Sequence, residues 1–69
     1  MTFGKYIKNS RETLAKGSKG YSLRKVAIAI EVEPSFLSKV ERDLVSPPSE
    51  AKIVALAGQL GEDPDILLA

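Results

Sequence analysis

The fold is decided by residues 22–42, which read Ser22-Leu-Arg-Lys-Val-Ala-Ile-Ala-Ile-Glu-Val-Glu-Pro-Ser-Phe-Leu-Ser-Lys-Val-Glu-Arg42. In the first half, apolar residues recur at helical spacing and predict a short helix from about Ser22 to Ile30. Pro34 suits the first turn of a second helix, where its missing N–H costs nothing. That helix begins around Glu33 and ends near Arg42, and its apolar stripe consists of Phe36, Leu37 and Val40. The stretch therefore contains two short helices separated by about three residues.

Further helices are predicted on either side of this pair. Apolar spacing predicts a first helix from about Phe3 to Ala15, which the glycines of residues 17–20 break. After a loop with two successive prolines, Ser49 is the expected N-cap of a fourth helix, and Gly61 closes that helix.

A short fifth helix is predicted at the end of the chain. Asp63 is its expected cap, Pro64 lies in its first turn, and Ile66 and Leu67 face inward. The chain is therefore expected to be all-α, with five helices, and residues 1–69 are expected to form a single domain.

Composition excludes several classes of function. The sequence has no cysteine and no histidine, so thiolate and imidazole metal sites and Ser-His-Asp catalysis are excluded. We therefore expect no enzyme, no metal and no other cofactor, and no small-molecule ligand site is evident. No apolar run approaches the roughly 20 residues that span a bilayer, and the N-terminus lacks the apolar core of a signal peptide. By elimination, we expect a soluble cytoplasmic protein.

Charge is divided unevenly along the chain, although the net charge is only +1. Residues 1–30 carry seven basic residues and one acidic residue, whereas residues 31–69 carry three basic and eight acidic residues. This division predicts a positive face and a negative face, and the positive face is compatible with a polyanion such as a nucleic acid. An ordinary solvated surface is the alternative.

The helix pair of residues 22–42 has the arrangement of a helix-turn-helix, whose second helix enters the major groove of DNA. The arrangement alone is weakly specific, because many small bundles contain tight helical pairs. The residues are more specific: Pro34-Ser-Phe-Leu-Ser-Lys-Val-Glu-Arg42 and the helix before it strongly resemble the Cro/repressor-type (XRE) helix-turn-helix family of DNA-binding transcriptional regulators. Ser46-Pro-Pro-Ser49 and Gly61-Glu-Asp-Pro-Asp-Ile-Leu-Leu68 resemble the family's later helices. The resemblance implies a five-helix repressor-like bundle with the helix-turn-helix formed by helices two and three.

The resemblance also implies which residues reach the bases. In the family, the first two residues of the recognition helix and one a turn later contact base edges. These positions are Pro34, Ser35 and Lys39 here, with Ser38 beside them. Residues 35, 38, 39 and 42 share one polar helix face, and both Lys and Ser can hydrogen-bond to bases. A plain solvated face is the alternative.

Phosphate contacts are expected around this face. Arg42 ends the recognition helix and is expected at a phosphate. The starts of helices two and four offer free backbone N–H groups to anions, and basic residues add charge at the first of these. The predicted DNA-contacting residues are therefore Ser22, Arg24, Lys25, Glu33, Pro34, Ser35, Ser38, Lys39, Arg42 and Ser49.

Family relatives pair an arginine of helix one with a glutamate near the end of helix three, which implies a structural ion pair between Arg11 and Glu41. Three features depart from the family. Leu23 replaces a glutamine that bonds phosphate, and Glu31 replaces a turn glycine with positive φ, at a cost of roughly 1 kcal/mol. The loop of residues 43–46 lacks basic residues for phosphates, and its apolar residues are expected to meet a partner chain or the sugar edge of DNA.

The resemblance implies a homodimer, because one recognition helix reads few base pairs and repressors of this type bind two half-sites about 34 Å apart. The last helix has more apolar side chains than a small monomer can easily hide. We expect Leu67 in the core and either Ile66 or Leu68 shared with a partner, although Ile66 could instead complete the core. The expected interface consists of Pro64, Asp65, Ile66, Leu68 and Ala69.

The function expected from these features is a sequence-specific transcriptional regulator, a repressor, that binds a palindromic operator in double-stranded DNA as a dimer. The alternative is a protein-interaction module of the same fold, such as an antitoxin-type partner of another protein. The leucine at position 23 and the loop without basic residues favour this alternative. An enzyme is disfavoured, because no nucleophile–base pair can be assembled without histidine or cysteine.

Overall fold

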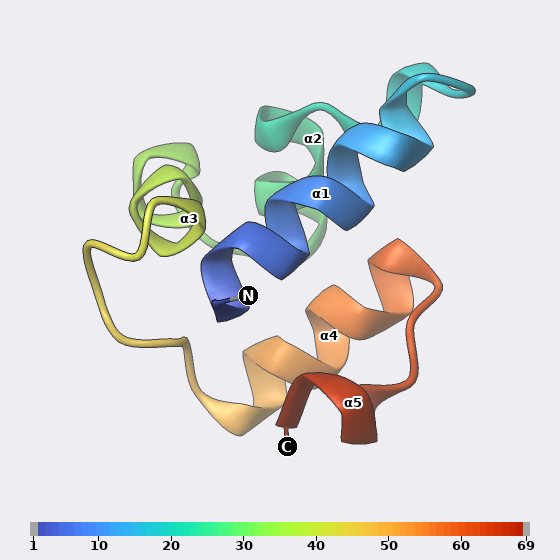
Figure 1. The fold of residues 1–69 in the computed structure, drawn as a ribbon. Coiled ribbons are helices and arrows are strands. Elements are labelled where there is room, and N and C mark those ends of the chain that lie inside the picture. The colour runs from blue at the N-terminus through green and yellow to red at the C-terminus, as the bar shows by residue number, and fades with distance from the viewer. Residues whose placement is uncertain (1, 69) are drawn as a thin grey trace.

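The computed structural model describes residues 2–68, which form five α-helices and a short 3-10 helix, with no strand among them. In chain order these are α1 (Phe3–Ala15), η1 (Lys19–Tyr21), α2 (Leu23–Ala29), α3 (Pro34–Glu41), α4 (Glu50–Leu60) and α5 (Pro64–Leu68). The α1 helix runs between the α2–α3 pair and the α4–α5 pair (Figure 1). The predicted all-α, five-helix fold is confirmed, whereas η1 carries no apolar repeat and was not predicted. None of these helices is both long and apolar enough to cross a membrane.

Side-chain caps begin three of the predicted helices, and Thr2 Oγ1 caps α1 by accepting the N–H of Lys5 at 3.2 Å. Ser22 Oγ accepts a hydrogen bond from the backbone N–H of Lys25 at 3.2 Å, and Asp63 Oδ1 accepts one from the N–H two residues on at 2.9 Å. Ser49 is the N-cap residue of α4, as predicted, although its hydroxyl makes no capping hydrogen bond. The exposed carboxylate of Glu50 in the first turn supplies negative charge at this helix end instead.

Three helices end in the same left-handed turn. The φ angle is +61° at Glu31 after α2, +59° at Asp43 after α3 and +67° at Gly61 after α4. At all three, the next residue donates its N–H back five residues, to the carbonyls of Ala27, Lys39 and Ala57 at 3.0, 2.9 and 2.9 Å. This is the Schellman arrangement, which usually has glycine at the left-handed position. The positive φ predicted for Glu31 is confirmed, and Asp43 adopts one that the sequence did not signal.

Apolar side chains from all five α-helices meet in one core. Its buried members are Ile7, Val26, Ala27, Ile30, Leu37, Ile53, Leu56, Ala57, Leu60 and Leu67. The α1 helix supplies Ile7 to this core and α4 supplies four residues. Since α1 also contacts α3 and α4 contacts α2, these two helices fix the place of the α2–α3 pair in the bundle.

Two residues expected to face inward do not. Phe36 is only half-buried, because the buried face of α3 is formed by Leu37, Val40 and Glu41. Phe36 lies about 100° around the helix axis from Leu37 and therefore falls at the edge of that face. Ile66 is 57% exposed, because α5 has five residues and turns only Leu67 into the core.

Candidate functional site

The α2–turn–α3 pair forms the helix-turn-helix expected from the sequence. Glu31 makes the left-handed turn between the helices, and the side chain of Lys52 of α4 hydrogen-bonds to the backbone of that turn. The Nζ atom of Lys52 donates to the carbonyl oxygen of Ile30 at 2.8 Å and to that of Glu31 at 3.4 Å. A cation at the carboxyl end of α2 is favoured by the helix dipole. Nothing in the sequence singled out Lys52, because the contact joins positions more than twenty residues apart.

The outer face of α3 presents the polar residues predicted to read bases. Ser35 and Lys39 are exposed and Ser38 is half-buried. Pro34 is half-buried at the first helical position, and Glu33 is exposed just before it. Among residues 2–68, neither Ser35 nor Lys39 uses its side chain in a hydrogen bond or ion pair. Both side chains therefore have hydrogen-bonding capacity for a ligand.

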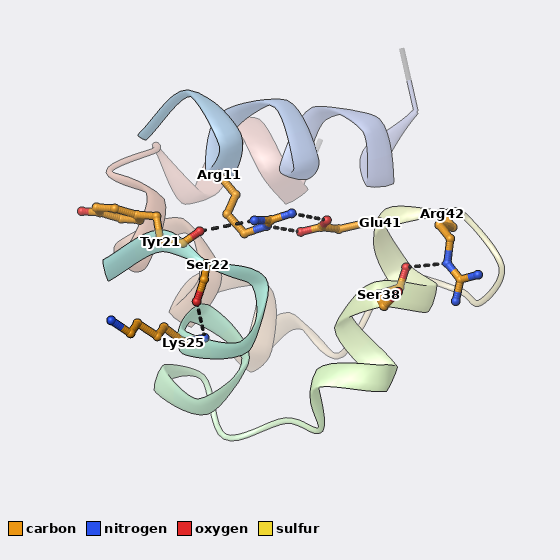
Figure 2. A network of polar contacts seen from close by, with 7 residues as sticks. All are labelled: Arg11, Tyr21, Ser22, Lys25, Ser38, Glu41 and Arg42. Atoms are coloured by element: carbon orange, nitrogen blue, oxygen red, sulfur yellow. Dashed lines mark hydrogen bonds and ion pairs between the residues drawn. The ribbon is translucent and has the colours of Figure 1, made fainter. Parts of the chain in front are cut away.

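Arg42 follows directly after α3 and lies on the outside of the helix. Its Nε atom donates to the carbonyl oxygen of Ser38 at 3.3 Å (Figure 2). The same carbonyl also accepts the backbone N–H of Arg42 at 3.1 Å, so the side chain folds back over the last turn of α3. The side-chain bond occupies one nitrogen of the guanidinium and leaves the two terminal nitrogens to point outward, as an anion contact requires.

The start of α2 carries a second group of predicted contact residues. Ser22 uses its hydroxyl to cap the helix, so its side chain is already engaged (Figure 2). Arg24 and Lys25 are exposed in the first turn. Ser49 is exposed at the start of α4. The start of α2 therefore combines positive side chains with a helix N-terminus, the combination that favours anions, whereas the start of α4 carries the carboxylate of Glu50.

A buried ion pair joins α1 to α3. Arg11 Nε lies 2.7 Å from Glu41 Oε2, and Arg11 Nη2 donates to Glu41 Oε1 at 2.9 Å. The third donor, Nη1, reaches the carbonyl oxygen of Tyr21 at 3.3 Å (Figure 2). The side chains are 11% and 2% exposed. The hydrogen bonds to Glu41 raise the pKa of Arg11 above its ordinary value, against the opposing effect of burial. The pair implied by the resemblance is therefore present and is bidentate.

The predicted interface residues lie on α5, at the opposite end of the bundle from α3 (Figure 1). Ile66 is 57% exposed and Leu68 is 40% exposed, and α4 adds Val54 at 43%. Asp65 is exposed and Pro64 is half-buried. Ala69 falls outside the described residues.

An open pocket of about 320 Å³ lies between α1 and the end of α4. Tyr6 and Ser10 donate their hydroxyls there to the Glu62 carboxylate, at 3.0 and 3.1 Å. The hydrogen bond to Glu62 raises the pKa of Tyr6 above its ordinary value. None of the residues predicted to contact DNA lines this pocket. It is therefore separate from the candidate site.

Comparison with solved structures gives a match along the whole chain. The chain is similar to SinR, named as the master regulator for biofilm formation, in its crystal structure in complex with DNA. The two are 32% identical with a TM-score of 0.79, and the match covers 99% of this chain and 100% of the SinR chain. No protein-family model matches the sequence, and no curated protein matches it.

Proposed function

The chain belongs to the Cro/repressor-type (XRE) helix-turn-helix family, and on this premise we propose that it is a sequence-specific transcriptional regulator that binds double-stranded DNA. The observation that carries the proposal is the exposed polar face of α3, which is held as the second helix of a helix-turn-helix. The likeness to SinR, a regulator crystallised in complex with DNA, supports the same role for this chain.

In the proposed complex, α3 lies in the major groove and Ser35, Ser38 and Lys39 face the base edges. The lysine ammonium can donate to guanine O6 and N7, and the serine hydroxyls can donate or accept. Pro34 gives the helix a rigid start, and Glu33 precedes it at the positive helix end. Sequence preference in this chain therefore rests on short side chains and one lysine.

Phosphate contacts come from three basic side chains, Arg24, Lys25 and Arg42, and from the helix starts at Ser22 and Ser49. Leu23 packs against the core cluster and cannot make the phosphate contact of the glutamine found in relatives. Each neutralised phosphate contributes about −0.9 to the slope of log K against log salt. Three basic side chains on each of two protomers therefore give a slope of about −5. Affinity should then fall about a thousandfold between roughly 50 and 200 mM salt.

We infer that the regulator forms a homodimer through α5. As a dimer it acts as a repressor at a palindromic operator. Ile66 and Leu68 on α5 and Val54 on α4 are exposed apolar side chains, and these two helices pack on each other at the end of the bundle away from α3. Ile66→Glu should give monomers in sedimentation experiments at concentrations where the wild type dimerises. Ile28→Glu is the matched control, because Ile28 is 60% exposed but lies on α2. Sedimentation of the wild type as a monomer, both free and on DNA, would refute the dimer.

Selection of bound DNA from a random pool tests the proposed function directly. A palindromic motif with half-site centres about 34 Å apart is expected. Lys39→Ala should relax preference at one base position, at a cost of about 1–3 kcal/mol for that base. Arg42→Ala should weaken binding to all sequences and reduce the salt slope by about one. The absence of both an enriched motif and binding at low salt would exclude the proposal.

A protein-interaction module of the same fold is the second candidate. It is favoured by Leu44 and Val45, which are 62% and 36% exposed in a loop without basic residues. Such a module should bind no DNA even at low salt, whereas the regulator should bind DNA with steep salt dependence.

A further inference from the structure

The end of α3 is fastened to the start of α1 by Asp43. Its Oδ2 atom accepts a hydrogen bond from Thr2 Oγ1 at 2.6 Å, and its Oδ1 atom accepts one from the backbone N–H of Gly4 at 3.1 Å. The N–H of Gly4 is one of the donors in the first turn of α1 that have no partner within the helix. A carboxylate that follows the recognition helix therefore acts as a cap for a helix some forty residues earlier.

The backbones of the two helices meet at this point without a side chain between them. A Cβ atom on Gly4 would lie 2.6 Å from Asp43 Oδ1 and 2.8 Å from the carbonyl oxygen of Glu41, and nearer still to that of Val40. The first turn of α1 is thus pressed against the last carbonyls of α3. Since the positive end of one helix dipole faces the negative end of the other, the approach is also electrostatically favourable.

Asp43 performs two tasks that a glycine could not combine. With φ at +59° it forms the left-handed turn that ends α3, and its N–H bonds the carbonyl of Val40 at 3.1 Å. Aspartate and asparagine tolerate this conformation better than most residues. Glycine would adopt the turn with less strain but would leave Thr2 and Gly4 without their acceptor.

We propose that Asp43 is a positioning residue for DNA reading, which fixes the angle at which the outer face of α3 meets the bases without touching DNA itself. Leu37 and Val40 are buried on the inner face of α3, and Glu41, its last residue, pairs with Arg11 of α1. Asp43, two residues beyond Glu41, adds a second polar link from this end of α3 to the start of α1. Because the two links reach α1 about two turns apart, together they resist rotation of α3 against α1. Base contacts require placement within about 0.5 Å and 10–20°. The inference rests on the proposed function.

The test compares Asp43→Gly with Asp43→Asn. Glycine keeps the left-handed turn and removes the acceptor, whereas asparagine keeps one acceptor oxygen in a tolerated conformation. Glu31→Gly is the matched control, because Glu31 occupies the same position after α2 and its carboxylate makes no hydrogen bond among residues 2–68. The readout is the ratio of affinities for the selected operator and for scrambled DNA, at a temperature where circular dichroism shows each variant folded.

We expect Asp43→Gly to lower this ratio about fivefold or more, the low end of what one good base contact contributes. Binding to scrambled DNA should not weaken, Asp43→Asn should recover most of the ratio, and Glu31→Gly should leave it unchanged. A merely structural role would lower the melting temperature of Asp43→Gly and leave the ratio of the folded protein unaltered.

The role of Asp43 is overturned if Asp43→Gly keeps the ratio within twofold of the wild type, or if Asp43→Asn loses as much. If Asp43→Gly does not fold, Thr2→Val removes one of the two bonds, together with the Thr2 cap of α1, without changing the turn at Asp43, and its ratio should fall in the same direction. A wild type that selects no DNA sequence instead contradicts the proposed function, so the two failures can be told apart.

Discussion

Arg11→Met tests how much the buried ion pair contributes to the fold. Methionine keeps much of the apolar stem of arginine and removes the guanidinium, with its two bonds to Glu41 and its bond to the carbonyl of Tyr21. The Glu41 side chain is 2% exposed, so water cannot replace the lost donors without opening the structure. The variant therefore leaves a buried carboxylate without a partner.

The expected cost follows from this burial. Removing one member of a buried pair destabilises proteins by about 3–5 kcal/mol, and screening by solvent is small because Arg11 is only 11% exposed. A chain of this size is stable by roughly 3–10 kcal/mol in total. The loss corresponds to a fall in melting temperature of about 12 °C or more. Arg11→Met should therefore be close to unfolding at room temperature.

Urea and thermal unfolding followed by circular dichroism measure the effect. Lys8→Met is the matched control, since Lys8 is exposed on the same helix and its loss should change stability by less than about 0.5 kcal/mol. The double variant Arg11→Met/Glu41→Leu should be more stable than Arg11→Met, because no charge is then left unpaired. The reasoning is refuted if the free energy of unfolding of Arg11→Met lies within about 1 kcal/mol of the wild-type value. It is also refuted if the double variant is no more stable than Arg11→Met.

Three further outcomes are expected from unfolding and titration experiments. Glu31→Gly should stabilise the fold by about 1 kcal/mol, because glycine adopts the observed φ of +61° without strain, and a measured loss of stability contradicts this. Gly4→Ala should destabilise the fold by about 3 kcal/mol, because the new methyl group overpacks against backbone oxygens of α3. The control Gly58→Ala has open space around it and should stabilise the fold. Equal effects of the two substitutions contradict the close approach of α1 to α3 at Gly4. The hydroxyl of Tyr6 donates to Glu62 only when protonated, so its stabilising effect is complete below pH of about 10 and is lost as pH rises through the raised pKa; Tyr6→Phe should remove this part of the stability profile in alkaline unfolding curves.

Much of the fold could be predicted from the sequence because its signals are local. The apolar spacing from Phe3 to Ala15 gave the bounds of α1, and Pro34 marked the first residue of α3. Gly61 marked the end of α4 through its conformational freedom. These signals act within one or two turns of helix and do not depend on what packs nearby. The partners Arg11 and Glu41 came from the family resemblance and not from any spacing in the chain.

The tertiary structure decided which residues hold these helices together. Asp43, Lys52 and Glu62 each bond to groups at least twenty residues away, and no periodic pattern links such positions. It also decided that Phe36 lies at the edge of the buried face, since helical spacing defines a stripe but not where its centre falls. The sequence alone therefore determined where the helices run and which face of α3 is polar. The angle of that face was decided only by packing, because it depends on contacts that join the carboxyl end of α3 to two places on α1.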